Sequence, residues 1–102
     1  MNTLLEKLKT TENLHCVLTE EITYELYYDP KESKFCMSYF MPPKDNSKFF
    51  DYVMNQDEEL GHKIARIRLG TDGCKLDDKQ ADIVATGMLL KKDELKFEVH
   101  KE

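Results

Sequence analysis

Six side chains in this sequence belong to the types that ligate zinc and related metal ions. They are three cysteines and three histidines: Cys16, Cys36, Cys74, His15, His62 and His100. Zinc sites that can be recognised in a sequence place two ligands two to four residues apart, and no pair among these six has that spacing. We therefore predict no metal ion and no cofactor, and we interpret the thiols as core residues and the imidazoles as surface residues.

Cys74 is the best candidate for a catalytic nucleophile. It follows the turn at 71–73 and precedes Lys75, a setting that suits a reactive thiol. However, no histidine lies near it in the sequence to act as the base that thiol catalysis needs. A thiol enzyme that uses Cys74 is therefore kept as an alternative, and the leading expectation is that the protein is not an enzyme.

A basic stripe is formed by Lys63, Arg66 and Arg68. These side chains would hold an anion, with an aromatic ring such as that of Tyr27 stacked on it, which makes a small-ligand or nucleotide-binding module a second alternative. The glycines of the chain do not match a P-loop or a dinucleotide fingerprint. Three positive charges alone would bind nucleic acid only weakly.

Acidic residues dominate the first part of the chain, where residues 1–60 carry a net charge of −6 against +1 for the remainder. This charge disfavours nucleic acid and anionic membranes and favours a protein partner with a basic surface. Tyrosine, phenylalanine and methionine, which are enriched in protein interfaces, are frequent in the same part. The predicted partner-binding residues are Glu20, Glu21, Glu25, Tyr27, Asp29, Glu32, Asp57, Glu58 and Glu59.

The leading hypothesis is thus a small acidic, non-enzymatic protein-binding module that acts as an inhibitor or adaptor. Its composition, rich in Lys, Glu, Asp and Tyr and without Trp, is typical of small regulators from bacteria or phages. The charged start of the sequence does not fit a secretory segment, and no apolar run reaches the roughly 20 residues of a membrane helix. With an odd number of cysteines, three in all, we expect reduced thiols and a cytoplasmic location.

Hydrophobic periodicity predicts the elements that position these residues. Helical spacing predicts helices over 2–10, 47–56 and 78–86, the last with a capping-box pattern. The acids at 57–59 suggest that the second helix ends near Gln56, or that a further turn begins there, with Gly61 as the stop. Alternating apolar and polar residues predict strands over 14–18, 22–28, 34–41, 63–69, 87–91 and 95–100.

The clearest of these features is an antiparallel hairpin formed by 22–28 and 34–41 around the turn at Asp29-Pro30. The stretch 77–90 is also compatible with a hairpin in place of the helix. We predict one domain, residues 1–102, of the α+β class, with a mainly antiparallel sheet of about five to six strands and two or three short helices packed on one face. The free edge of the 95–100 strand would allow a homodimer to form across a two-fold axis.

Overall fold

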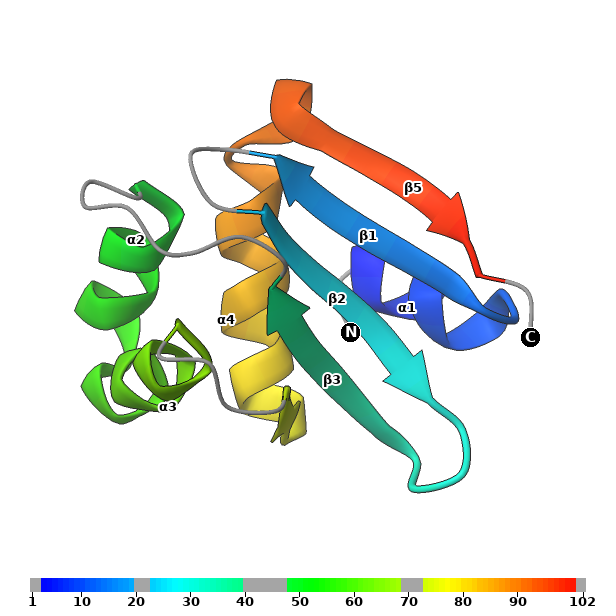
Figure 1. The fold of residues 1–102 in the computed structure, drawn as a ribbon, viewed down its shortest axis with the longest axis horizontal. Coiled ribbons are helices and arrows are strands. Elements are labelled where there is room, and N and C mark those ends of the chain that lie inside the picture. The colour runs from blue at the N-terminus through cyan, green and yellow to red at the C-terminus, as the bar shows by residue number, and fades with distance from the viewer. Residues whose placement is uncertain (1–2, 20–22, 40–47, 69–72, 101–102) are drawn as a thin grey trace.

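Five strands pair into one antiparallel sheet in the order β4-β3-β2-β1-β5 (Figure 1). The computed structural model describes residues 3–19, 23–39, 48–68 and 73–100. Along the chain the elements are α1 (Thr3–Thr10), β1 (Leu14–Thr19), β2 (Thr23–Asp29), β3 (Lys34–Tyr39), α2 (Lys48–Gln56), α3 (Glu58–Arg68), β4 (Cys74–Leu76), α4 (Asp78–Leu89), the 3-10 helix η1 (Lys92–Glu94) and β5 (Leu95–Val99). The predicted α+β class and antiparallel sheet are confirmed, and four α-helices rather than two or three lie in the described part of the chain.

The β2–β3 hairpin confirms the clearest prediction from the sequence. Its strands pair in antiparallel register, with Tyr28 opposite Phe35. The Asp29 carboxylate holds the turn because it accepts a hydrogen bond from the backbone N–H of Lys31 at 2.9 Å. Residues 22, 40 and 41 of the predicted strands lie outside the described residues.

The first strand, β1, lies between β2 and β5. Cys16 of β1 is opposite Leu26 of β2 and opposite Phe97 of β5. Residues directly opposite one another in antiparallel strands share a face of the sheet. The strands therefore present one common face to the core, and the strand nearest the C-terminus completes the sheet beside the first strand.

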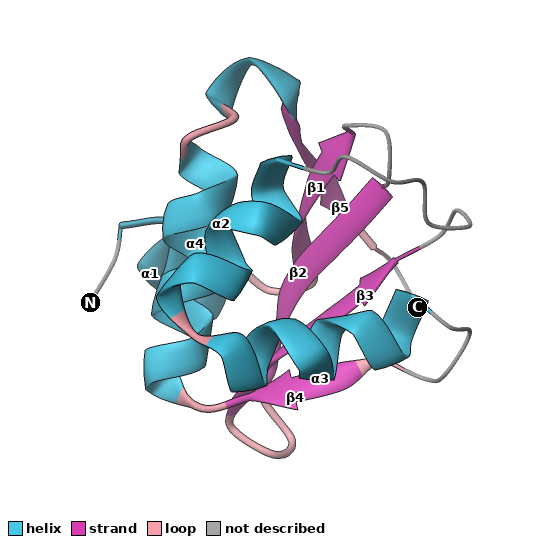
Figure 2. Cartoon of the chain, turned by 90° about the vertical axis from the view of Figure 1, so that its left-hand side faces the viewer, coloured by secondary structure: helices cyan, strands magenta, loops and turns pink. Residues whose placement is uncertain are grey.

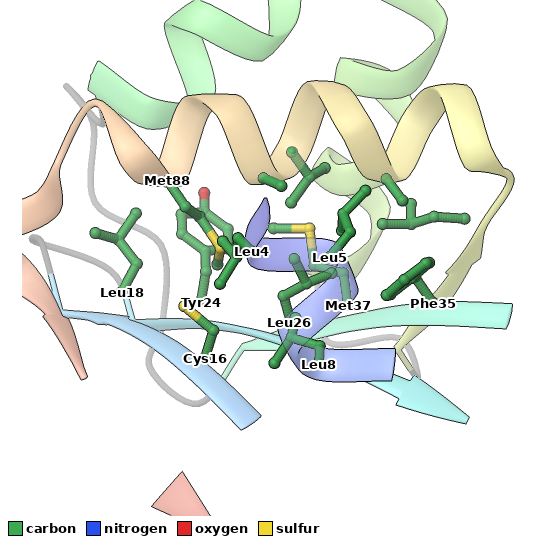
Figure 3. Packing of buried hydrophobic residues seen from close by; sticks show 14 of the residues in the cluster. Leu4, Leu5, Leu8, Cys16, Leu18, Tyr24, Leu26, Phe35, Met37 and Met88 are labelled. Carbon is green, nitrogen blue, oxygen red and sulfur yellow. The ribbon is translucent and has the colours of Figure 1, made fainter. Parts of the chain in front are cut away.

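The core lies between this face and the helices. Figure 2 shows α1, α2 and α4 together on one side of the sheet, with α3 beside β4. Helix α1 contributes Leu4, Leu5 and Leu8, which are at most 5% exposed and point toward buried residues of the sheet and α4 (Figure 3). From the sheet and α4 the core receives Cys16, Leu18, Tyr24, Leu26, Phe35, Met37, Val84 and Met88. Burial of these apolar side chains supplies the main favourable contribution to folding.

The predicted strand over 63–69 is wrong, because these residues belong to helix α3, apart from residue 69, which lies outside the described part. Leu60, Ile64 and Ile67 recur at helical spacing and are at most 2% exposed. The helix begins at the acidic run: the Asp57 carboxylate accepts a hydrogen bond from the backbone N–H of Leu60 at 3.1 Å. Acids in a first helical turn also interact favourably with the helix dipole.

Gly61 does not end a helix, contrary to one expectation from the sequence. It lies inside α3, where a β-carbon would come within 1.9 Å of the Met54 sulfur in α2. A larger residue there would require the flexible Met54 side chain to shift, since the Met54 Cα would lie 3.3 Å from the added β-carbon.

Helix α4 confirms the predicted helix over 78–86 and continues to Leu89, so the predicted strand over 87–91 is wrong. Its capping box is complete: Gln80 N–H donates to Asp77 Oδ1 at 2.7 Å, and Asp77 N–H donates to Gln80 Oε1 at 3.1 Å. Gly87 lies inside the helix and does not break it. A β-carbon at this position would lie 2.9 Å from the Tyr52 ring, so the missing side chain allows α4 to pack closely against α2. Packing against α2 thus outweighs the weak helix propensity of glycine.

The short strand β4 was not predicted from the sequence. It has three residues and pairs with β3, too few for an alternating pattern to be recognised. The Cα radius of gyration is 12.4 Å, close to the roughly 13 Å expected for a compact domain of this length. No helix in the described ranges is long and apolar enough to cross a membrane.

Candidate metal centre

The face of the sheet that points away from α1, α2 and α4 carries most of the polar side chains of the strands. Because Cys16 and Leu26 face the helices, their neighbours along β1 and β2 point the other way. The register places the following side chains on this second face, which we call the outer face: His15, Val17, Glu25, Tyr27, Cys36, Ser38, Lys75, Lys96 and Glu98.

Glu25 of β2 is the only charged residue that is buried among the described residues, with 3% of its surface exposed. Its Oε1 atom contacts His15 Nδ1 and lies 3.3 Å from His100 Nε2. Its Oε2 atom accepts a long hydrogen bond of 3.5 Å from the Ser38 hydroxyl. A buried carboxylate is costly unless it is paired, so these imidazoles are the groups that make the position of Glu25 tolerable.

The two histidines come from opposite ends of the chain and stack on one another. Their ring centroids are 3.7 Å apart and their planes differ by 1°. The His15 ring also stacks on Tyr27, at 4.5 Å between centroids. His100 follows β5 and is fixed by its backbone N–H, which donates to the Asn13 carbonyl at 2.8 Å. Pairing of β5 with β1 therefore brings His100 to His15.

Burial shifts the pKa values of three side chains on the outer face, those of His15, Tyr27 and Cys36. It lowers the pKa of His15, and the nearby Glu25 carboxylate opposes that shift. Burial also raises the pKa of Tyr27 and, with a contribution from the Asp29 charge, the pKa of Cys36. The neutral imidazole that burial favours is the form in which histidine ligates a metal ion.

One ligand atom from each of His15, Glu25 and His100 lies within 4.8 Å of the other two. In a tetrahedral zinc site, bonds of about 2.0–2.2 Å place two ligand atoms roughly 3.3–3.6 Å apart. The 3.3 Å separation between His100 Nε2 and Glu25 Oε1 matches that spacing. Two imidazoles and one carboxylate form a familiar three-ligand set that leaves a fourth position open.

A hollow of about 310 Å³ opens beside the two imidazoles. Its lining includes His15, His100, Tyr27 and Lys31. Small-molecule pockets start at about 300 Å³, so this hollow admits water or a small ligand. An ion held by the three side chains would border that space.

The predicted partner-binding residues of the hairpin are not arranged as one free acidic surface. Glu25 is buried in the cluster described above. Lys75 pairs with Asp29 at 3.7 Å and also contacts Glu32, so these two acids are partly neutralised. Tyr27 is half-buried against His15, and Glu20 and Glu21 lie outside the described residues.

The second group of predicted partner-binding residues begins helix α3. Asp57 caps that helix through its hydrogen bond to Leu60, so its carboxylate has a structural role. Glu58 and Glu59 are exposed, and Glu58 forms an i, i+4 pair with His62 at 3.6 Å. An exposed pair of this kind contributes little to stability.

The alternative ligand set is not brought together with its aromatic residue. Lys63 is held by hydrogen bonds to Gln80 Oε1, at 3.2 Å, and to the Lys75 carbonyl. Arg66 is exposed, and Arg68 is the last residue of α3. Helix α3 packs against β3 and β4, whereas Tyr27 stacks on His15 on the outer face of β2.

Cys74 is half-buried at the start of β4. Burial raises the pKa of its thiol, and the nearby Lys63 charge only partly opposes the shift. A reactive cysteine needs the opposite shift, toward the thiolate. This environment therefore gives the thiol-enzyme alternative no support.

Comparison of the chain with protein-family models, with curated proteins and with solved structures gives no match. The site must therefore be understood from its own residues. His15 and His100 were among the candidate ligands in the sequence, but Glu25 was assigned to partner binding. The three residues have one feature in common in the sequence: each occupies a position that points to the outer face, in a strand or directly after one. Only the β2-β1-β5 order shows that these positions converge.

Proposed function

We propose that this protein binds a divalent first-row transition-metal ion through His15, Glu25 and His100. The observation that carries the proposal is the convergence of two imidazoles on one buried carboxylate, with one ligand atom of each residue within 4.8 Å of the other two. Imidazole and carboxylate together suit zinc, iron, cobalt, nickel and copper rather than calcium, which prefers oxygen ligands alone. This revises the expectation of no metal ion, which rested on spacing along the sequence.

Electrostatics supports the same ligand set. Glu25 is a carboxylate with 3% exposure on a face that no helix covers in the described part of the chain. A divalent cation bound there would stabilise the buried charge more strongly than a neutral imidazole does. Ligation of one ion by both imidazoles requires at least one ring to turn out of the parallel stack, because each nitrogen lone pair lies in the plane of its ring.

Isothermal titration of the chelator-treated protein with Zn²⁺ alone tests the proposal. We expect one ion per chain, and a Co²⁺ titration should give the intense visible absorption of a tetrahedral site. His100→Ala is the key variant because the side chain is 43% exposed and its removal leaves the core intact. Changes to groups outside the first coordination shell already alter affinity by about 10–100-fold, so loss of a ligand should weaken binding by at least about 100-fold.

Two control variants make the test specific. His62→Ala removes an imidazole that is 58% exposed on α3 and lies outside the cluster, and it should leave binding unchanged. Cys36→Ser removes the thiol on the outer face and should also leave the stoichiometry at one ion. The proposed ligand set would be refuted if His62→Ala and His100→Ala lost equal zinc affinity. Zinc binding that depends on Cys36 and not on His100 would refute it as well.

The protein-binding role expected from the sequence stays a prediction, as do the non-enzymatic character and the cytoplasmic location. Among the described acidic residues that were predicted to bind a partner, the exposed ones are Glu32, Glu58 and Glu59. Glu58 and Glu59 are adjacent in the first turn of α3 and are the best available contacts for a basic partner.

A further inference from the structure

Strand β5 forms one edge of the sheet, and no described strand pairs with its outer side. The other edge strand, β4, lies beside helix α3 (Figure 2). Lys63 of that helix donates a hydrogen bond to the Lys75 carbonyl of β4. Exposed edges invite pairing with another chain. The two edges of the sheet thus differ, and only β5 offers a free strand of five residues.

The backbone groups that face outward along β5 follow from its pairing with β1. The His100 N–H donates to the Asn13 carbonyl, so residues 100 and 13 form a hydrogen-bonded pair. Hydrogen-bonded and non-hydrogen-bonded pairs alternate along an antiparallel ladder. Residues 96 and 98 therefore bond toward β1, and residues 95, 97 and 99 direct their N–H and C=O groups to the free side.

The side chains of β5 are also exposed on this edge. Phe97 is 42% exposed and Val99 is 59% exposed, and Leu89 and Leu90 lie close before them in the sequence. These four are the exposed large hydrophobic residues among the described ones. Phe97 is partly covered by the Lys7 ammonium group, which lies 4.1 Å from the ring centroid. Two of these four, Phe97 and Val99, belong to the edge strand itself, which marks β5 as an interface candidate.

The sequence of β5 is complementary to itself when two copies run antiparallel. If Phe97 is opposite Phe97 of the partner subunit, Lys96 is opposite Glu98 of the partner subunit and Leu95 is opposite Val99 of the partner subunit. Both opposite-charge pairs fall on the outer face, and all apolar pairs fall on the core face. The same register places residues 95, 97 and 99, whose backbone groups point outward, in the hydrogen-bonded positions.

We propose that a second copy of this chain binds along β5 and joins the two sheets into one continuous antiparallel sheet across a two-fold axis at Phe97. Backbone geometry, apolar exposure and charge pattern all agree on this register. The proposal is independent of the metal centre, because the Glu25 carboxylate and both imidazoles come from within one chain.

Sedimentation equilibrium over a range of protein concentrations tests the dimer, and charge exchange tests the register. Lys96→Glu places two like-charge pairs in the interface, as does Glu98→Lys, and each should weaken dimerisation by about tenfold. The double variant K96E/E98K restores opposite charges at both positions and should recover most of the affinity. Lys92→Glu makes the same charge change just outside the strand and should have no effect.

A backbone variant tests the pairing without changing charge. Val99→Pro removes an outward N–H at the end of an edge strand, where proline is tolerated, and should abolish the dimer while the monomer stays folded by circular dichroism. A monomer at all concentrations up to about 1 mM would overturn the proposal, since edge pairing with apolar cover should be detectable there. So would a dimer that K96E/E98K fails to restore, or one that survives V99P.

Discussion

The two faces of the sheet are built from alternate residues of the same strands, yet they obey different rules. The face toward the helices is filled by apolar side chains such as Leu26 and Met37, which are 0% exposed. The outer face buries Val17, Cys36 and the carboxylate of Glu25 without a covering helix in the described part of the chain. Burial on the first face stabilises the fold by itself, whereas burial on the second face creates a requirement for a charged partner.

The largest expected difference between the faces is in stability. Leu26→Ala should lower the free energy of unfolding by about 2–5 kcal/mol, because it opens a cavity in a fully buried site. Tyr27→Ala, one residue along β2, should cost no more than about 1 kcal/mol through the lost cross-strand stacking on His15. Urea denaturation of both variants measures this difference. Equal losses of unfolding free energy would contradict the distinction between the core face and the outer face.

Zinc should stabilise the protein through the outer face alone. At a free zinc concentration 100 times the dissociation constant, the free energy of unfolding should rise by about 2.7 kcal/mol. Glu25→Gln keeps the shape of the side chain but loses its charge, and it should show little or no zinc-dependent rise in melting temperature. If zinc raises the melting temperature of Glu25→Gln as much as that of the parent protein, the ion binds elsewhere and not on the outer face.

Alkaline pH should weaken the core face through Cys16, which is 0% exposed. Burial raises the pKa of this thiol from 9.0 to about 11. Above pH 9 the unfolded chain releases the thiol proton first, so the folded state binds more protons and the free energy of unfolding falls as pH rises. The loss is complete only above pH 11 and amounts to roughly 3 kcal/mol. Cys16→Ala should show a shallower decline between pH 9 and 11 than the parent protein, and parallel declines would exclude this assignment.

The smallest expected effect on stability comes from the exposed acids of α3, which belong to neither face of the sheet. Glu58→Gln with Glu59→Gln should change the free energy of unfolding by less than about 1 kcal/mol, from lost interactions with the helix dipole. If these acids bind a basic partner, the double variant should lose a salt-sensitive partner that the parent protein captures. Glu12→Gln with Asp82→Asn, which removes two other exposed acids, is the matched control. Capture unchanged in both double variants would exclude Glu58 and Glu59 from the interface.

Local patterns predicted the elements whose partners lie close in the sequence. The β2–β3 hairpin and the capping box of α4 were predicted because turn and capping residues fix their geometry. Helix α3 was mistaken for a strand because Ala65 and Ile67 happen to alternate with polar residues, although Leu60 and Ile64 complete a buried helical stripe. The strand predicted over 87–91 was also wrong. Helix α4 continues through Gly87, where the neighbouring Tyr52 ring leaves no room for a β-carbon.

The candidate metal centre could not be predicted in the same way, because its geometry depends on strand order. His15, Glu25 and His100 lie on three different segments, and only the pairing of β5 with β1 joins them. Alternation along each strand does indicate that His15 and Glu25 point away from the core. It does not indicate which strands are neighbours, and hydrophobic patterns carry little information on that point.

The pairing of β1 with β5 also has a kinetic consequence. Contacts between segments so distant along the chain require closure of a long loop, which slows folding relative to a protein of mainly local contacts. During synthesis the β1–β2–β3 meander can form early, but the free side of β1 stays without its neighbour until residues 95–99 have emerged. For that interval β1 is the aggregation-prone strand that a chaperone would need to shield. Occupancy of the His15, Glu25 and His100 site would then report that the last strand has been added.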